Sequence, residues 1–129
     1  MSAPKILYCH CAYTQVVPAE VKDAVLRKLC DSGVSFEAVA DLCETSARRD
    51  PSLKQMADGA VKIAACYPRA VKWLFAAAGA PLNIEAAEVL NMRTQPAAEV
   101  IEALMKPELT PNVPAGKETI EAVAEGVGK

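Results

Sequence analysis

The sequence predicts a small single-domain α/β fold, a parallel sheet of about four strands with helices on both of its faces. Short apolar segments alternate with amphipathic segments along the chain, and parallel neighbours require crossover connections of the kind that helices provide. Prolines and glycines mark most of the segment boundaries. The chain has 129 residues, 52% of them hydrophobic and 23% charged, which suits one core of ordinary size.

The first predicted strand, residues 5–11 (KILYCHC), is a short apolar run that ends in Cys-His-Cys. Pro18 is a good first-turn residue and opens a predicted helix, AEVKDAVLRKLCDSG, which Gly33 ends. Apolar residues such as Val25 and Leu29 recur at three- and four-residue intervals, and the charged residues fall on the other side. One face of this helix should therefore pack and the other should face water.

The second predicted strand is residues 34–42 (VSFEAVADL), in which apolar and polar side chains alternate imperfectly. Cys43 follows it, and the charged residues 44–50 (ETSARRD) are predicted to form a solvated loop. Asp50 and Pro51 then provide an N-cap and first-turn signal for a short helix, PSLKQMADG.

The third predicted strand, residues 60–66 (AVKIAAC), is short, apolar and bounded by glycine and proline, as a buried central strand would be. Pro68 begins the next predicted helix, PRAVKWLFAAAG, in which Trp73 and Phe75 are expected in the core or at an interface. Cys66 therefore lies at a strand-to-helix turn.

The position of residues 83–90 predicts a fourth strand, although their alanines and glutamates would also suit a helix. A turn follows, and then a helix from residue 95 or 96 to Met105. We divide the chain into an α/β cysteine-cluster domain, residues 1–106, and a proline-containing C-terminal tail, residues 107–129, expected to be mobile or docked.

The charge pattern argues against several partners. The net charge is −2, the isoelectric point is near 5.4 and no basic run occurs, so neither nucleic acid nor a membrane surface is expected. No apolar run approaches the roughly 18 residues that span a bilayer, and the N-terminus lacks the features of a secretory signal. The expectation is a cytoplasmic protein.

The five cysteines need an explanation, because a reducing compartment disfavours structural disulfides. A disulfide between Cys9 and Cys11, only one residue apart, would be strained, whereas both could bind one metal centre. If the strand predictions hold, Cys9, Cys11, Cys43 and Cys66 all lie at carboxyl ends of strands, where parallel-sheet proteins bind their ligands. Four thiolates can hold an iron–sulfur cluster or, equally, a zinc ion.

Burial of four thiolates requires compensating charge. The helices that begin near Pro51 and Pro68 would direct their positive ends at the site, and Arg69, helped by Arg48 or Arg49, would offset charge further. The same features are expected to lower the pKa values of the thiols.

The fifth cysteine, Cys30, and the histidine between Cys9 and Cys11 are not expected to be ligands. Cys30 lies on a helix face without motif support and is expected to fill the core. His10 would alternate away from its neighbouring thiols in a continuing strand, so its expected role is packing or support of the ligands rather than ligation.

Three stretches carry a further signal: the CHC that ends the first strand, the single cysteine after the second, and VKIAACYPRAVKWLF, with its pattern A-A-C-x-P-R-x-x-x-x-L-F. Together they resemble the N-terminal cluster-binding domain of the large, flavin-containing subunit of heterodisulfide reductase. More distantly they resemble the small delta subunit of the hydrogenase that partners that enzyme. The resemblance covers about residues 5–75.

The resemblance implies a 4Fe–4S cluster that feeds electrons toward a flavin domain. Carried over position by position, it implies that the ligands are Cys9, Cys11, Cys43 and Cys66. This chain departs from the family in having larger residues at four positions, and it lacks the flavin-binding portion. These positions are Ala12, Glu44, Thr45 and Tyr67.

The leading hypothesis is a single-cluster electron-transfer protein rather than a stand-alone enzyme. It would dock on a larger redox partner, a flavin or iron–sulfur protein, through the tail after Pro107 or an apolar patch near Trp73. The first alternative is an enzyme that handles thiols, persulfides or disulfides with Cys9 or Cys66. The second is an interaction module stabilised by zinc. A homo-oligomer is left open.

Overall fold

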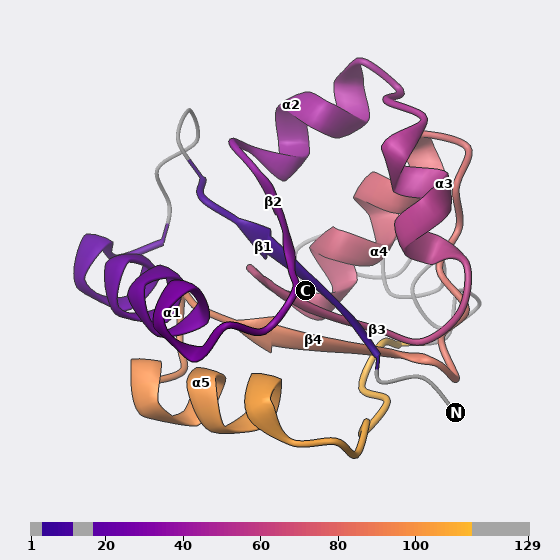
Figure 1. The fold of residues 1–129 in the computed structure, drawn as a ribbon. Helices are drawn as coiled ribbons and strands as arrows, with labels where there is room; N and C mark the ends of the chain where they lie inside the picture. The colour runs from indigo at the N-terminus through magenta and orange to yellow at the C-terminus, as the bar shows by residue number, and fades with distance from the viewer. Residues whose placement is uncertain (1–3, 12–16, 115–129) are drawn as a thin grey trace.

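Four strands form one all-parallel sheet in the order β2-β1-β3-β4 (Figure 1). The structure is a computed structural model that describes residues 4–11 and 17–114, and the counts of elements refer to those residues. The strands are β1 (Lys5–Cys9), β2 (Glu37–Val39), β3 (Val61–Ala65) and β4 (Ala87–Asn91). The predicted fold class is confirmed, and the fourth segment forms a strand rather than the alternative helix.

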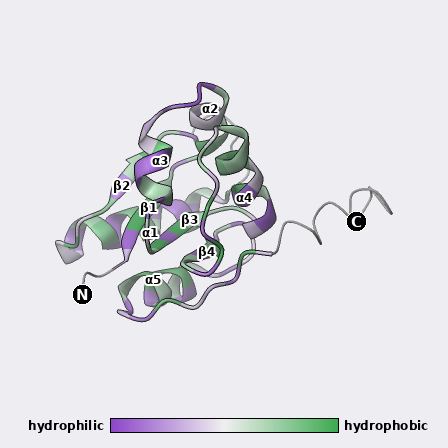
Figure 2. Cartoon of the chain, turned by 90° about the vertical axis from the view of Figure 1, so that its right-hand side faces the viewer, coloured by the Kyte–Doolittle hydropathy of each residue, from purple (hydrophilic) through white to green (hydrophobic). Residues whose placement is uncertain are grey.

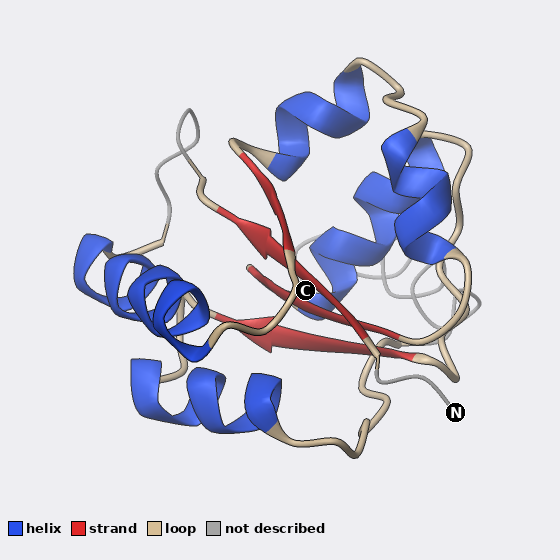
Figure 3. Ribbon diagram, in the orientation of Figure 1, coloured by secondary structure: helices blue, strands red, loops and turns tan. Residues whose placement is uncertain are grey.

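Four of the five described helices connect successive strands, the fifth follows β4, and together they cover both faces of the sheet (Figure 3). They are α1 (Ala19–Ser32), α2 (Leu42–Ala47), α3 (Ser52–Ala57), α4 (Pro68–Ala77) and α5 (Ala97–Met105). Helices α1 and α5 contact each other on one face, whereas α2 and α4 contact each other on the other, with α3 beside them (Figure 1). Coverage of both faces explains why the strands β3 and β4 are buried throughout.

Each long helix turns one apolar stripe toward the sheet, as its residue spacing predicts. The hydrophobic stretches lie toward the middle of the molecule in Figure 2, and hydrophilic ones occupy outer turns. The buried helical side chains include Val25 and Leu29 of α1, Val71 and Phe75 of α4, and Val100 and Leu104 of α5.

A buried lysine ties strand β3 to helix α5. Lys62 is only 1% exposed, and its Nζ donates hydrogen bonds of 2.6 Å to the carbonyl oxygens of Ala103 and Lys106. Its Nζ also lies 4.0 Å from the carboxylate of Glu88. The last carbonyls of a helix have no partner within the helix, so this ammonium satisfies two groups at the end of α5.

The predicted solvated loop of residues 44–50 is wrong, because most of it belongs to helix α2. Asp41 caps this helix by accepting a 3.0 Å hydrogen bond from the backbone N–H of Cys43. Thr45 and Ser46 are buried, and the Ser46 hydroxyl donates to the Leu74 carbonyl at 2.6 Å, which joins α2 to α4. Short polar side chains with such hydrogen-bond partners can be buried. The polar composition of residues 44–50 therefore did not mean that they form a solvated loop.

One other expectation about exposure is wrong, because Cys30, expected to fill the core, is exposed on α1. Phe75 is fully buried, as one of the two alternatives for it required, whereas Trp73, two residues earlier in α4, is 48% exposed. The second strand is also shorter than predicted, since β2 contains three residues.

The first part of the predicted tail, residues 107–114, docks beside strand β4. The Asn112 side chain both accepts from the N–H of Val89 and donates to its carbonyl, each at 2.8 Å, as a neighbouring strand would. The backbone N–H of Thr110 donates to the Glu88 carboxylate at 3.1 Å. This segment therefore covers an edge of the sheet that would otherwise be unpaired. Residues 115–129 lie outside the described part of the chain.

Candidate cysteine site

The four candidate cysteines follow three adjacent strands at the carboxyl edge of the sheet. Cys9 ends β1 and Cys11 lies two residues beyond it, Cys43 is in the first turn of α2 after β2, and Cys66 directly follows β3. In the order β2-β1-β3-β4, the chain passes from β1 to its neighbour β2 on one side and then crosses back to β3 on the other side of β1. Open parallel sheets place their ligand crevice where the strand order reverses in this way, here between β1 and β3.

Cys9 is buried beside backbone hydrogen-bond donors. Its side chain is 7% exposed, and its Sγ accepts a 3.2 Å hydrogen bond from the backbone N–H of Leu42, the first residue of α2. Burial raises the pKa of Cys9 to about 11, outweighing the hydrogen bonds from the N–H groups of Leu42 and Cys11. The helix end that reaches this thiol is that of α2, and not that of the helix near Pro51.

Cys66 is half-buried and within electrostatic reach of two other thiols. Burial raises its pKa, and the thiols of Cys43 and Cys11 raise it further, whereas the N–H of Tyr67 and the guanidinium of Arg93 lower it. The expectation that helix ends and cations would lower the thiol pKa values is therefore wrong for Cys9 and Cys66. In both, desolvation of the thiolate is the larger effect.

Cys11 has a strained backbone. It is buried, and its φ of 58° lies in the left-handed region, which costs a non-glycine residue about 1 kcal/mol or more. Such strain concentrates at functional sites, where the surrounding structure maintains it.

The residue between Cys9 and Cys11 packs against α1. His10 Nδ1 lies 3.2 Å from the hydroxyl of Tyr8, which itself donates to the Lys22 carbonyl at 2.8 Å. Lys22 Nζ in turn donates to the His10 carbonyl at 2.9 Å. These contacts fix the end of β1 on α1 and agree with the packing role predicted for His10.

The cation beside Cys66 is Arg93, a residue of the turn predicted between the fourth strand and the last helix. Its guanidinium lies 5.1 Å from the ring centroid of Tyr67. Arg93 belongs to the turn after β4, where its backbone N–H donates a 3.0 Å hydrogen bond to the Asn91 side chain. The rule that carboxyl-end loops of a parallel sheet share one edge, applied to β4 as well, would have identified it.

The three arginines predicted to compensate the thiolates are all exposed. Arg48 pairs with Glu44 at 2.8 Å and with Asp50 at 3.2 Å, and Arg49 donates to the Ala77 carbonyl at 3.4 Å, so both contact groups other than the thiols. Arg69 is exposed near the start of α4 and borders a surface hollow. Its proposed role toward a cofactor stays a prediction.

The described thiols are not arranged as a preformed metal site in this structure. Within residues 4–11 and 17–114, no three or more His, Cys, Asp or Glu side chains are arranged so that they could hold a metal ion. The donor types fit an iron–sulfur or zinc centre, but ligation requires the side chains to approach one another from where they stand here.

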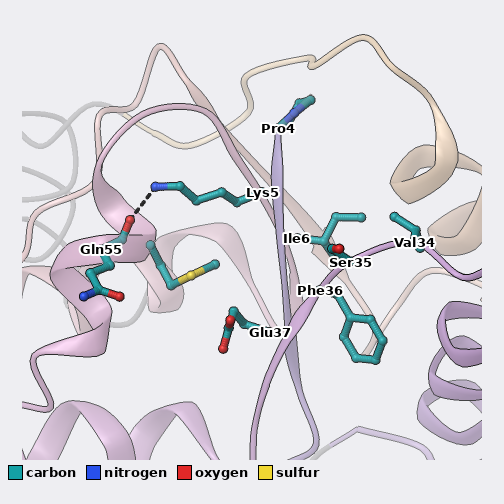
Figure 4. Close-up of a pocket in the computed structure, with 9 residues that line it drawn as sticks. Pro4, Lys5, Ile6, Val34, Ser35, Phe36, Glu37 and Gln55 are labelled. Carbon is teal, nitrogen blue, oxygen red and sulfur yellow. Dashed lines mark hydrogen bonds between the residues drawn. The ribbon is translucent and has the colours of Figure 1, made fainter. Parts of the chain in front are cut away.

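A separate pocket of about 740 Å³ lies at the opposite edge, near the amino ends of β1 and β2 (Figure 4). The charged side chain of Lys5 points across it toward α3, where Nζ donates to the carbonyls of Gln55 and Asp58. This lysine therefore satisfies the end of a helix, as Lys62 does for α5.

Comparisons with protein-family models, with curated proteins and with solved structures found no match. The resemblance to the heterodisulfide reductase domain therefore rests on the quoted residues and stays a prediction. Among the described helices, none combines the length and apolar character needed to cross a membrane.

The raised pKa of Cys9 predicts how stability depends on pH in metal-free protein. Between the ordinary value of 9.0 and about 11, the unfolded chain loses this thiol proton while the folded chain keeps it. The free energy of unfolding should therefore fall as pH rises, by up to about 1.4 kcal/mol per pH unit from this group. Urea denaturation at pH 8 to 11 should show a shallower fall for Cys9→Ala than for the wild type. Parallel curves for the two proteins would contradict the assignment.

Proposed function

We propose that this chain carries one 4Fe–4S cluster, ligated by Cys9, Cys11, Cys43 and Cys66, and exchanges single electrons with a larger redox protein. One observation carries the proposal. These four cysteines follow three adjacent strands at one edge of the sheet, whereas the fifth, Cys30, lies exposed on helix α1. When bound, such a cluster takes up and releases one electron at a time.

The surroundings of the thiols suit this role. Backbone N–H groups of Leu42 and Tyr67 face the sulfurs of Cys9 and Cys66, and hydrogen bonds to ligand sulfurs tune the reduction potential of a cluster. Burial excludes water around Cys9 and Cys11. Cys43 is exposed at the start of α2 and lies within electrostatic reach of Cys66.

The pKa directions favour ligation over nucleophilic chemistry. A thiol attacks a disulfide or carries sulfur as its thiolate, yet the pKa values of Cys9 and Cys66 are both raised. Both thiols are therefore protonated at neutral pH in the metal-free chain. A metal centre overcomes this obstacle, because binding of the metal displaces the proton.

Anaerobic purification followed by a visible spectrum and by iron, sulfide and zinc analysis tests the proposal. We expect a brown protein with about four irons and four sulfides per chain. A colourless protein that binds no iron after anaerobic reconstitution would contradict the proposal. Stoichiometric zinc in its place would assign the thiols to a structural zinc site.

A further inference from the structure

An exposed aromatic surface lies directly beside Cys66. Tyr67 and Trp73 are the exposed large hydrophobic residues of the described chain, at 44% and 48% exposure. They border a hollow of about 730 Å³ between α4 and the docked segment that ends at Pro114, and we call this region the Trp73 surface. It is lined in part by Tyr67, Arg69, Trp73, Asn112 and Pro114.

The Trp73 surface is positively charged in a protein whose net charge is −2. Arg69 lines the hollow, Arg93 lies over the Tyr67 ring, and no described residue lining the hollow is acidic. Tryptophan, tyrosine and arginine are also the residues that contribute most to binding at protein interfaces. An apolar centre with arginines around it matches a partner surface that carries carboxylates around an apolar patch.

The position of this surface suits electron transfer. Tyr67 follows Cys66 in the chain, its backbone N–H faces the Cys66 thiol, and Cys66 is partly exposed, whereas Cys9 and Cys11 are buried. A partner on the Trp73 surface would therefore approach a bound cluster on its Cys66 side.

We infer that the Trp73 surface is the docking site for the redox partner and that this partner presents an acidic surface. The inference rests on the proposed function and deepens it. Arg69 and Arg93 steer the partner by charge, and Trp73 supplies the apolar contact.

The test measures electron exchange by stopped flow between cluster-loaded protein and flavodoxin, an acidic flavin mononucleotide protein, in whichever direction is downhill. The variants are Arg69→Glu and Trp73→Ala. Arg27→Glu is the matched control, because it makes the same charge change at an exposed position on α1, on the other face of the sheet. Iron content is measured first for each protein.

We expect Arg69→Glu to lower the second-order rate constant by about tenfold or more, and added salt to lower the wild-type rate. Trp73→Ala should also lower it, whereas Arg27→Glu should stay within about twofold of the wild type. With cytochrome c, a basic probe, Arg69→Glu should not slow the reaction.

Several results would overturn the inference. Absence of iron from the wild type would remove the proposed function and the inference with it. Loaded variants with wild-type rates, or no exchange with flavodoxin in either direction, would overturn the inference alone. Loss of the cluster in Arg69→Glu would assign Arg69 to the cofactor. If the wild type sediments as a dimer and Trp73→Ala sediments as a monomer, the Trp73 surface would be the contact between two copies of the chain.

Discussion

Replacement of Cys66 by serine is expected to remove most of the bound iron, whereas Cys30→Ser should leave the iron content unchanged. Cys66 follows the central strand β3 and lies within electrostatic reach of Cys43 and Cys11. Changes to residues that merely support a metal ligand cost about 10- to 100-fold in affinity, so loss of a ligand should cost at least as much. Cys30 is exposed on α1 and is not among the proposed ligands.

Iron and sulfide per chain, measured after anaerobic reconstitution and passage over a chelator, would compare the two variants. Cys66 suits the comparison because it is only half-buried, so a serine there should not unfold the chain, which circular dichroism would verify. Equal iron loss in both variants, or full iron retention in Cys66→Ser, would refute the ligand assignment.

Lys62→Met is expected to lower the free energy of unfolding by about 3 kcal/mol, whatever the function of the chain. The change leaves the carbonyls of Ala103 and Lys106 without their shared donor and the Glu88 carboxylate without its nearby cation. A buried polar group left without a partner costs about 1–3 kcal/mol, and methionine keeps most of the side-chain volume. For a domain of this size the melting temperature should fall by roughly 10 °C or more.

Urea denaturation at pH 7 would measure the free energy of unfolding of Lys62→Met, with Lys28→Met as the control. Lys28 is exposed on α1, so its replacement should change the free energy of unfolding by no more than about 0.5 kcal/mol. In a double-mutant cycle, Glu88→Gln should cost less in the Lys62→Met background than in the wild type, because the two groups interact. A loss below about 0.5 kcal/mol for Lys62→Met would show that water replaces the ammonium at the end of α5.

Some features of the candidate site could be predicted from local sequence. The apolar run before Cys66 and the proline after it mark a strand followed by a helix. The same reasoning placed Cys9 and Cys11 in the last part of a strand over residues 5–11, although β1 ends at Cys9. Cys43 lies instead in the first turn of α2, because Asp41 caps that helix. The polar residues 44–50 contain no local signal for the buried contact between Ser46 and α4, and that contact forms only when the two helices meet.

Local sequence was enough to predict the class of fold and the edge of the sheet at which Cys9, Cys11, Cys43 and Cys66 lie. These follow from apolar spacing and turn residues, which act over a few positions, and from the parallel connections that they require. Three other features become apparent only in the folded chain: Lys62 reaches a carbonyl 41 residues away, Arg93 lies beside Cys66, and burial raises the pKa of Cys9. Each of these depends on groups from distant segments, whose distances and burial are set when the sheet and its helices pack together.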